Sequence, residues 1–166
     1  MTPRSHDAAC VFCAIADRST DARIVAATAD TLTFLPLAPV HPGHVLVTPR
    51  AHVRDIWELD GNTAVAVGTA VLRAAHAVRA AHGAEGLNVI QSSGAVATQS
   101  VAHLHVHVVP RFREDRMPPL WPESREEDPR LLDDSARRLR VAMAALPYGR
   151  ETPGPLRGPV SALRPD

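Results

Sequence analysis

The alternation of apolar and polar residues along the chain predicts short β-strands arranged around one long helix. Two β-prone runs flank the turn Thr28–Asp30 and indicate a hairpin. Residues 35–43 carry three prolines and a glycine, and we expect them to form an ordered loop rather than a central strand. The predicted strands are Arg23–Ala26, Thr31–Phe34, His44–Thr48, Leu87–Gln91 and a segment that follows Gln99.

The helix is predicted between the third and fourth of these strands. From Asp60 to His82, apolar and small residues recur at three-to-four spacing, as on one face of an amphipathic helix. Asp60 can cap its start and Gly83 supplies a stop. A single long helix among strands with short connections predicts an α+β meander rather than a doubly wound parallel sheet.

The last predicted strand contains three alternating histidines. Successive side chains on a strand point to opposite faces, so His103, His105 and His107 should line one face, opposite Leu104, Val106 and Val108. The apolar face can be buried, which leaves the imidazole face for chemistry. Neighbouring imidazoles on such a face are separated by roughly 6.6 to 7 Å, enough to bracket a phosphate. The alternative is a half-exposed strand, or a His-rich tract that collects metal, without catalysis.

The composition changes after Arg111. Residues 112–129 are charged and proline-rich and indicate an extended connector, and Asp128-Pro129 then provides a cap and a first turn. An apolar stripe follows at helical spacing, and we expect it to pack on its own domain rather than on a partner or a membrane. Its members are Leu132, Ala136, Leu139, Met143 and Leu146.

These patterns divide the 166 residues into three parts. Residues 1–115 should form the domain, residues 116–148 the connector with the C-terminal helix packed on that domain, and residues 149–166 a disordered tail. The expected class is α+β.

Charge and composition narrow the classes of function. The 18 acidic and 18 basic residues cancel and no basic run is present, which argues against a non-specific nucleic-acid or membrane-surface binder. We expect no stretch to approach the ~20 apolar residues of a membrane span, and the first residues lack a hydrophobic signal core. The cytoplasm is therefore the predicted compartment. In a reducing compartment, the spacing Cys10-Val11-Phe12-Cys13 suggests metal or redox chemistry before a disulfide.

Alternating imidazoles next to a polar loop suit chemistry at phosphorus. A neutral imidazole nitrogen is a competent nucleophile, and a second imidazole can bind a phosphoryl oxygen. The middle residue, His105, is the natural nucleophile of a two-step route through a phospho-histidine. Side chains and backbone N–H groups of Thr98, Gln99 and Ser100 can donate to phosphoryl oxygens or serve the leaving group.

The sequence His103-Leu104-His105-Val106-His107-Val108-Val109 resembles the signature of the histidine triad (HIT) superfamily, with alternating histidines and apolar residues. The resemblance extends through the cysteine pair, through residues 42–52 and through Gln99-Ser100-Val101, and it is closest to the Hint-like bacterial branch. It implies a five-stranded antiparallel sheet with one main helix, usually as a homodimer. It also implies a nucleotide hydrolase or nucleotidyl transferase that cleaves at an α-phosphate through a nucleotidyl-histidine intermediate, without an organic cofactor.

The resemblance also assigns roles by position. It implies that His105 is the nucleophile, that His107 and His44 support the phosphate, and that Gln99 and Ser100 contact phosphate or leaving group. Ser92 stands where many Hint-like proteins have Asn. The predicted catalytic set is His103, His105 and His107, and the predicted substrate-binding set is Phe34, His44, Ser92, Thr98, Gln99 and Ser100.

The cysteine pair supplies only half of a tetrahedral zinc site. In some bacterial members of the family, two histidines complete it, and the matching positions here are His52 and His103. Zinc held by Cys10, Cys13, His52 and His103 would be structural. The alternative is a pair of reduced, buried cysteines and an unrelated His52.

One position departs from the family pattern. Members that bind a nucleoside commonly carry an acid two residues after the phenylalanine of the second strand, where it accepts hydrogen bonds from the ribose. Here Pro36 occupies that position, two residues after Phe34. The leading hypothesis is a hydrolase or transferase acting on a phosphoramidate, a mixed anhydride or a dinucleoside polyphosphate. The rival is a non-catalytic, zinc-stabilised module that binds a nucleotide or a protein.

Overall fold

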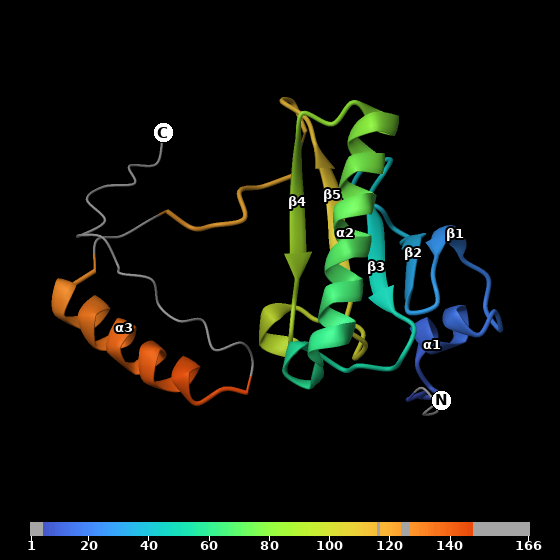
Figure 1. Ribbon diagram of the computed structural model, residues 1–166. Coiled ribbons are helices and arrows are strands. Elements are labelled where there is room, and N and C mark those ends of the chain that lie inside the picture. The colour runs from blue at the N-terminus through green and yellow to red at the C-terminus, as the bar shows by residue number, and fades with distance from the viewer. Residues whose placement is uncertain (1–4, 116, 124–126, 148–166) are drawn as a thin grey trace. The chain divides into compact units, whose positions relative to one another are not determined.

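A computed structural model describes residues 5–115, 117–123 and 127–147 (Figure 1). The chain divides into two compact units, residues 1–118 and 119–166. The first unit holds the sheet, the long helix and all three alternating histidines.

The sheet has five strands in the order β1-β2-β3-β5-β4, and each neighbouring pair is antiparallel. The predicted hairpin, five-stranded antiparallel sheet and α+β class are confirmed. A register shift between Ile24 and Ala26 marks an irregularity in the edge strand β1. The strands are β1 Arg23–Ala27, β2 Thr31–Leu35, β3 Val45–Pro49, β4 Gly86–Gln91 and β5 Val106–Arg111.

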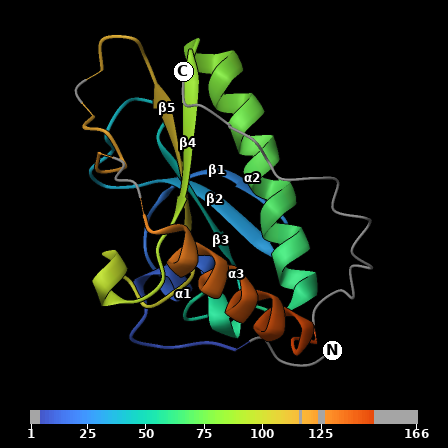
Figure 2. The same cartoon turned by 90° about the vertical axis from the view of Figure 1, so that its left-hand side faces the viewer.

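The main helix α2, Gly61–His82, lies along one face of the sheet (Figures 1 and 2). The Asp60 carboxylate accepts hydrogen bonds from the backbone of Asn62 and Thr63, and Gly83 ends the helix in the left-handed conformation with φ 63°. Both predicted ends are therefore confirmed. The inner face of α2 buries Val67, Ala74 and Val78.

The expectation that no stretch approaches a membrane span was wrong for α2. By length and composition alone, this helix is apolar enough to cross a membrane, because it is rich in alanine and valine. A helix that covers a sheet meets the same criterion, and three of its apolar residues are buried in the core on that face.

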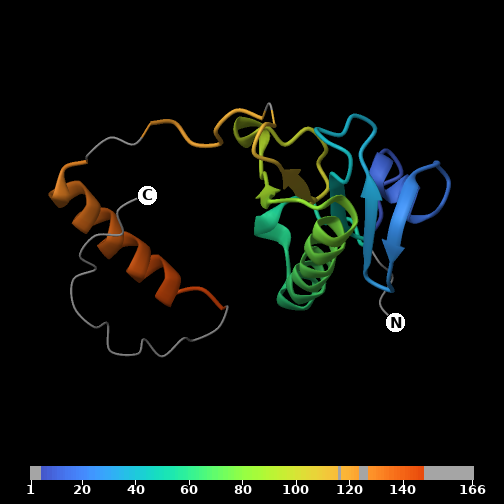
Figure 3. The same cartoon turned by 90° about the horizontal axis from the view of Figure 1, so that it is seen from above.

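The short helix α1, Val11–Ala16, contributes to a second core beside the β1–β2 hairpin (Figure 3). On β3, Val45 and Val47 belong to the core under α2, whereas Leu46 belongs to the core with α1. This alternation is the strand periodicity of two, and it assigns one core to each face of the sheet. Because Val106 and Val108 belong to the α2 core, His107 lies on the α1 face.

The histidine segment is less regular than the alternation predicted. Strand β5 begins at Val106, so that only His107 of the three lies within it. Before β5 the ladder gives way to other partners: the Leu104 N–H donates to Val53 O, and the Thr48 hydroxyl donates to Leu104 O. The imidazole face is also not open, since His103 is 0% and His105 5% exposed. The cause is α1, whose Phe12 ring packs on both histidines.

Two 3-10 turns, Ile56–Glu58 and Ala95–Ala97, complete the first unit. In the second unit, α3 spans Pro129–Ala144, with the Asp128 side chain accepting from Arg130 N–H and proline in the first turn. Its predicted start is thus confirmed. No side chain of α3 is buried within the described residues, and packing of its apolar stripe on the domain stays a prediction. The predicted tail, 149–166, lies outside the described residues.

Candidate functional site

A chain of hydrogen bonds links a loop to two imidazoles and sets the proton position on each ring. The Val40 backbone N–H donates to Nδ1 of His44 (3.1 Å), so that nitrogen carries a lone pair and the proton lies on Nε2. His44 Nε2 lies 2.9 Å from Nδ1 of His107 and donates to it. The proton of His107 is therefore on Nε2, which is left as a hydrogen-bond donor. We call these three groups the imidazole relay.

Burial keeps the relay neutral. It lowers the pKa of His107 to about 4, with smaller contributions from the neighbouring His105 and His44. It also lowers the pKa of His44, with His41 adding to the effect. At neutral pH both rings therefore carry one proton each, as the donor and acceptor pattern of the relay requires.

The turn before β3 fixes the position of His44. The His44 N–H donates to His41 O at 3.0 Å, and Gly43 has φ +89°. Proline at the second position and a positive φ at the third match a type II turn. A Cβ on Gly43 would also approach Cδ2 of His82, at the end of α2, to 2.6 Å. The positive φ therefore requires glycine here, and a Cβ would in addition force the exposed His82 ring to move aside.

His105 has a different partner. Its Nδ1 lies 2.7 Å from His103 O, and because a carbonyl only accepts, the proton is on Nδ1. The lone pair is therefore on Nε2. Its ring lies 5.1 Å from that of His107 and 5.3 Å from that of Phe12. The alternation of three histidines predicts an imidazole on each side of His105, whereas its ring packs against one histidine and one phenylalanine.

Cys10, Cys13, His52 and His103 lie together, as the family resemblance implies. Their four ligand atoms all fall within 4.8 Å of one another. Nδ1 of His103 lies 3.3 Å from Sγ of Cys10 and 3.7 Å from Sγ of Cys13, and Nδ1 of His52 lies 3.4 Å from Sγ of Cys13. Tetrahedral zinc with ordinary bond lengths requires S···N edges of about 3.5 Å. The donor set and its spacing thus fit zinc.

The proton positions in this cluster also suit a metal. His103 Nε2 donates to Pro49 O at 3.0 Å, which leaves the Nδ1 lone pair facing the sulfurs. Burial lowers the pKa of His103 to about 4, so its ring is neutral. Burial also raises the pKa of the Cys13 thiol, a cost that a bound cation would offset because it favours the thiolate. Both cysteines are free of disulfides.

The other predicted substrate residues lie in less uniform surroundings. Gln99 accepts from Gly94 N–H (2.7 Å) and donates to Arg54 O and Val101 O, so its amide braces the loop. Thr98 and Ser100 are exposed, Thr98 with φ 66°. Ser92 is half-buried. Phe34 is 2% exposed and packs edge-on against Phe12 in the second core.

Sequence reasoning missed three groups that set this geometry. Phe12 lies between the two cysteines, and an aromatic residue inside a metal-ligand pair was a signal that could have found it. The Val40 N–H and the Pro49 carbonyl gave no signal, because every residue has a backbone carbonyl and almost every residue a backbone N–H.

Comparison with known proteins agrees with this arrangement. The HIT domain matches residues 17–114. The chain is 34% identical over 106 residues to the adenosine 5'-monophosphoramidase of Schizosaccharomyces pombe, covering 64% of this chain and 77% of that protein. It is 34% identical over 103 residues to protein hit of Bacillus subtilis, covering 62% and 71%.

Solved structures show the same fold. A member of the HIT family from Bacillus subtilis has a TM-score of 0.75 at 29% identity, covering 80% of this chain and 96% of that one. A zinc-bound histidine triad family protein from Mycobacterium smegmatis has a TM-score of 0.62 at 32% identity, covering 81% and 97%.

Proposed function

This chain belongs to the HIT domain family, and we propose that it cleaves nucleotides at the α-phosphate through His105. Its similarity to an adenosine 5'-monophosphoramidase supports the function of a nucleotide hydrolase. One observation carries the proposal. The Nδ1–H of His105 is committed to His103 O, and this leaves Nε2 as a free nucleophile next to the ring of His107.

In the first step, Nε2 of His105 attacks the α-phosphorus. A P–N bond forms, the bond to the leaving group breaks, and the leaving group takes up a proton from solvent. The ring gains positive charge as this happens, and the His103 carbonyl that accepts from Nδ1–H stabilises that charge. Ser100 is the proposed contact for the leaving group.

In the second step, water attacks the phosphorus of the nucleotidyl-histidine and the P–N bond breaks. The nucleoside monophosphate leaves, a proton passes to solvent, and His105 recovers its Nε2 lone pair. With another acceptor in place of water, the same step is a nucleotidyl transfer.

His107 is proposed to hold the phosphoryl group. Its Nε2–H is a donor because Nδ1 accepts from His44, and it can donate to a non-bridging oxygen throughout both steps. His44 acts through His107 and is a positioning residue. The proposed roles of Thr98 and Ser92 are contacts from the neighbouring loop.

The substrate class follows from the chemistry at phosphorus. A phosphoramidate, a mixed anhydride and a dinucleoside polyphosphate each have a leaving group on the α-phosphorus, and the name of the yeast relative favours the phosphoramidate. The side chain of Pro36 offers no acceptor for a ribose hydroxyl, so we propose weaker selectivity for the nucleoside than for the phosphate.

We further propose structural zinc at Cys10, Cys13, His52 and His103. With four protein ligands, the metal would supply cross-linking rather than water activation. The ligands come from α1 and its cap, from the segment after β3 and from the segment before β5, which are distant in sequence. Zinc would therefore fix α1, and with it Phe12, against the histidines.

The predicted homodimer is also retained as a proposal. Val65 and Leu72 on α2 and Val89 on β4 are each more than half exposed, at 71%, 59% and 54%. Strand β4 is an edge of the sheet. An apolar surface beside an open strand edge is a feature that a second copy can cover.

A non-catalytic module is the second candidate, favoured by Pro36 and by the burial of His105 to 5% exposure. Intact-protein mass spectrometry distinguishes the two. The wild-type protein is mixed with adenosine 5'-phosphoramidate and quenched in base, which preserves a phosphoramidate bond on histidine. An added mass of one adenylyl group, absent in His105→Ala, supports the enzyme. Binding of the same compound without adduct or product supports the module.

A further inference from the structure

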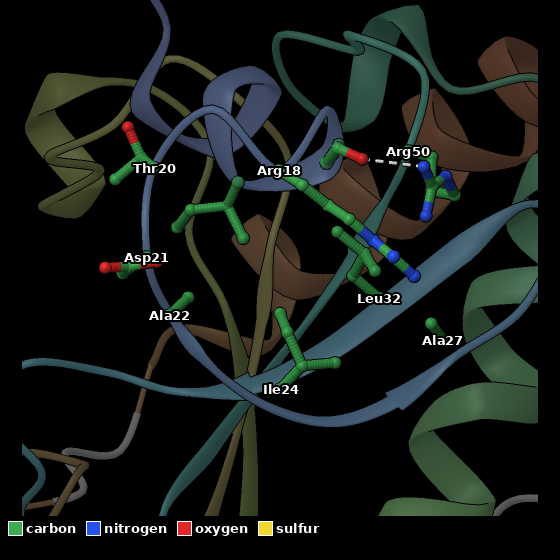
Figure 4. Close-up of a pocket in the computed structure, with 10 residues that line it drawn as sticks. Arg18, Thr20, Asp21, Ala22, Ile24, Ala27, Leu32 and Arg50 are labelled. Carbon is green, nitrogen blue, oxygen red and sulfur yellow. Dashed lines mark hydrogen bonds between the residues drawn. The ribbon is translucent and has the colours of Figure 1, made fainter.

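A cavity of about 290 Å³ lies between α1, the loop that follows it and the β1–β2 hairpin (Figure 4). None of the histidines or cysteines described above lines it. Its apolar wall includes Ile15, Ile24 and Leu32, and two arginines, Arg18 and Arg50, also line it. In Figure 4 the side chain of Arg18 extends along the cavity toward the end where Arg50 lies.

Among the residues that the structure describes, the two guanidinium groups have no acidic partner. Arg50 donates to Ala16 O at 2.6 Å, and this is a neutral carbonyl. Across the described part of the chain, neither Arg18 nor Arg50 forms an ion pair with a carboxylate. Asp21 also lines the cavity, but Figure 4 draws it at the opposite end from Arg50. The arginine end thus presents two uncompensated positive charges.

The backbone conformation of Arg18 independently indicates that this side chain has a function. Its N–H donates to Ile15 O and the Ser19 N–H donates to Ala14 O, the two bonds of a Schellman motif at the end of α1. The position requires the left-handed conformation, and Arg18 has φ 61°. Glycine is the usual residue here, and a side chain with a Cβ is strained. Among the described residues, the Arg18 guanidinium makes no hydrogen bond or ion pair that would offset this cost, and strain of this kind is concentrated at functional positions.

We propose that this cavity binds a small organic anion, with a carboxylate or phosphate head on an aliphatic body. The head would lie between Arg18 and Arg50, since guanidinium groups match both anions with paired hydrogen bonds. The body would lie on Ile15, Ile24 and Leu32. The site is separate from the histidines, and it does not depend on the function proposed above.

Titration of the full-length protein with hexanoate, hexyl phosphate and inorganic phosphate tests the proposal, with hexylamine as the matched cation. Backbone amide shifts locate the binding and calorimetry gives its affinity. We expect hexanoate or hexyl phosphate to shift amides of residues 15–24, and hexylamine not to do so. The tighter of the two anions identifies the head group. Shifts confined to the loop and strand that carry His44 and His107, or an absence of shifts at millimolar ligand, would overturn the site.

The variant Arg18→Gly separates ligand binding from folding. Glycine suits the left-handed position, so the melting temperature should rise, whereas affinity for the anion should fall by about tenfold or more, as expected for one charge-assisted pair. Arg73→Gln, on the exposed surface of α2, is the matched control and should leave the affinity unchanged. Equal affinity in wild type and Arg18→Gly would show that the cavity is not the anion site.

Discussion

His103 and His107 stand four residues apart in one motif, yet their rings belong to two different kinds of site. The ring of His103 donates to Pro49 O and turns Nδ1 toward two sulfurs. The ring of His107 accepts from His44 and keeps its Nε2–H as a donor. Burial lowers the pKa of both to about 4, so the difference between them is not one of charge.

The two rings differ in the hydrogen-bond partner of one nitrogen, and that partner decides whether the other nitrogen carries a lone pair or a proton. A backbone carbonyl forces a proton onto the nitrogen that faces it and leaves a lone pair on the other, which suits a metal ligand or a nucleophile. An imidazole that itself donates has the opposite effect and leaves a donor, which suits an oxyanion. His105 resembles His103 in this respect, because it also donates to a carbonyl, but the nitrogen that remains free is Nε2.

Removing the central ring is the change with the largest expected effect. His105→Ala should abolish turnover of adenosine 5'-phosphoramidate, by a factor of about 10⁴ or more, as found when other covalent enzymes lose their nucleophile. Folding and ligand binding should be largely retained. The measurement is steady-state hydrolysis, with calorimetric binding of adenosine monophosphate as the control. Wild-type activity in this variant would exclude His105 as the nucleophile.

Removing one proposed zinc ligand should mainly lower the stability of the protein. Cys10→Ser keeps the side-chain size but removes a thiolate ligand, and we expect the free energy of unfolding to fall by about 3–5 kcal/mol. Denaturant titration gives this value, and elemental analysis should show a drop from near one zinc per chain. Wild type treated with a chelator should reach a similar stability. Unchanged zinc stoichiometry in the variant would remove Cys10 from the proposed ligand set.

Breaking the imidazole relay should impair catalysis without loss of zinc. In His44→Phe a ring of similar size remains but the donor to His107 is lost, so His107 no longer has a fixed proton position. We expect kcat to fall by about 10- to 100-fold, as is typical when a residue that only orients another is lost, and by less than the ~10²- to 10⁴-fold of a group that itself transfers a proton. Zinc content and melting temperature should stay close to wild type. A parallel loss of zinc would mean that the imidazole relay and the zinc site depend on each other.

Acid should lower the free energy of unfolding, because the unfolded chain takes up protons that folded His107 does not. An unfolded histidine takes up its proton near its ordinary pKa of 6.5, whereas folded His107 does so only near 4. Between these values the unfolded state binds more protons, so stability falls as pH is lowered from about 6.5 towards about 4. Urea titrations at several pH values, compared between wild type and His107→Gln, should give a shallower slope for the variant. Equal slopes would contradict a depressed pKa at His107.

The smallest effect is expected from a change at Phe12, which packs against both the proposed zinc ligand His103 and the proposed nucleophile His105. Phe12 packs edge-on against His103 and His105, at 5.8 and 5.3 Å between ring centroids. Phe12→Leu keeps an apolar side chain but loses these ring contacts, each worth about 0.5–1.5 kcal/mol. We expect kcat to fall about three- to tenfold with KM and zinc content little changed. A change in KM alone would instead indicate a role of Phe12 in holding substrate.

Much of the fold could be predicted because its signals are local. Asp60 and Gly83 end the main helix by capping chemistry that a few residues contain, and the Asp128-Pro129 pair does the same for α3. The extent of β5 could not be predicted from alternation, since Val53 and Thr48, far away in sequence, take over the hydrogen bonds of Leu104. Extrapolated alternation also placed the imidazoles on an open face, which α1 covers.

The cysteine pair, the three histidines and the strands and helix that carry them can all be located from the amino-acid sequence. Which nitrogen of each ring is available depends on the folded arrangement. Side-chain identity cannot reveal this, because the deciding groups are the Val40 N–H and the carbonyls of Pro49 and His103. These backbone groups exist throughout the chain, and only the folded structure brings the right one within hydrogen-bonding distance of each imidazole.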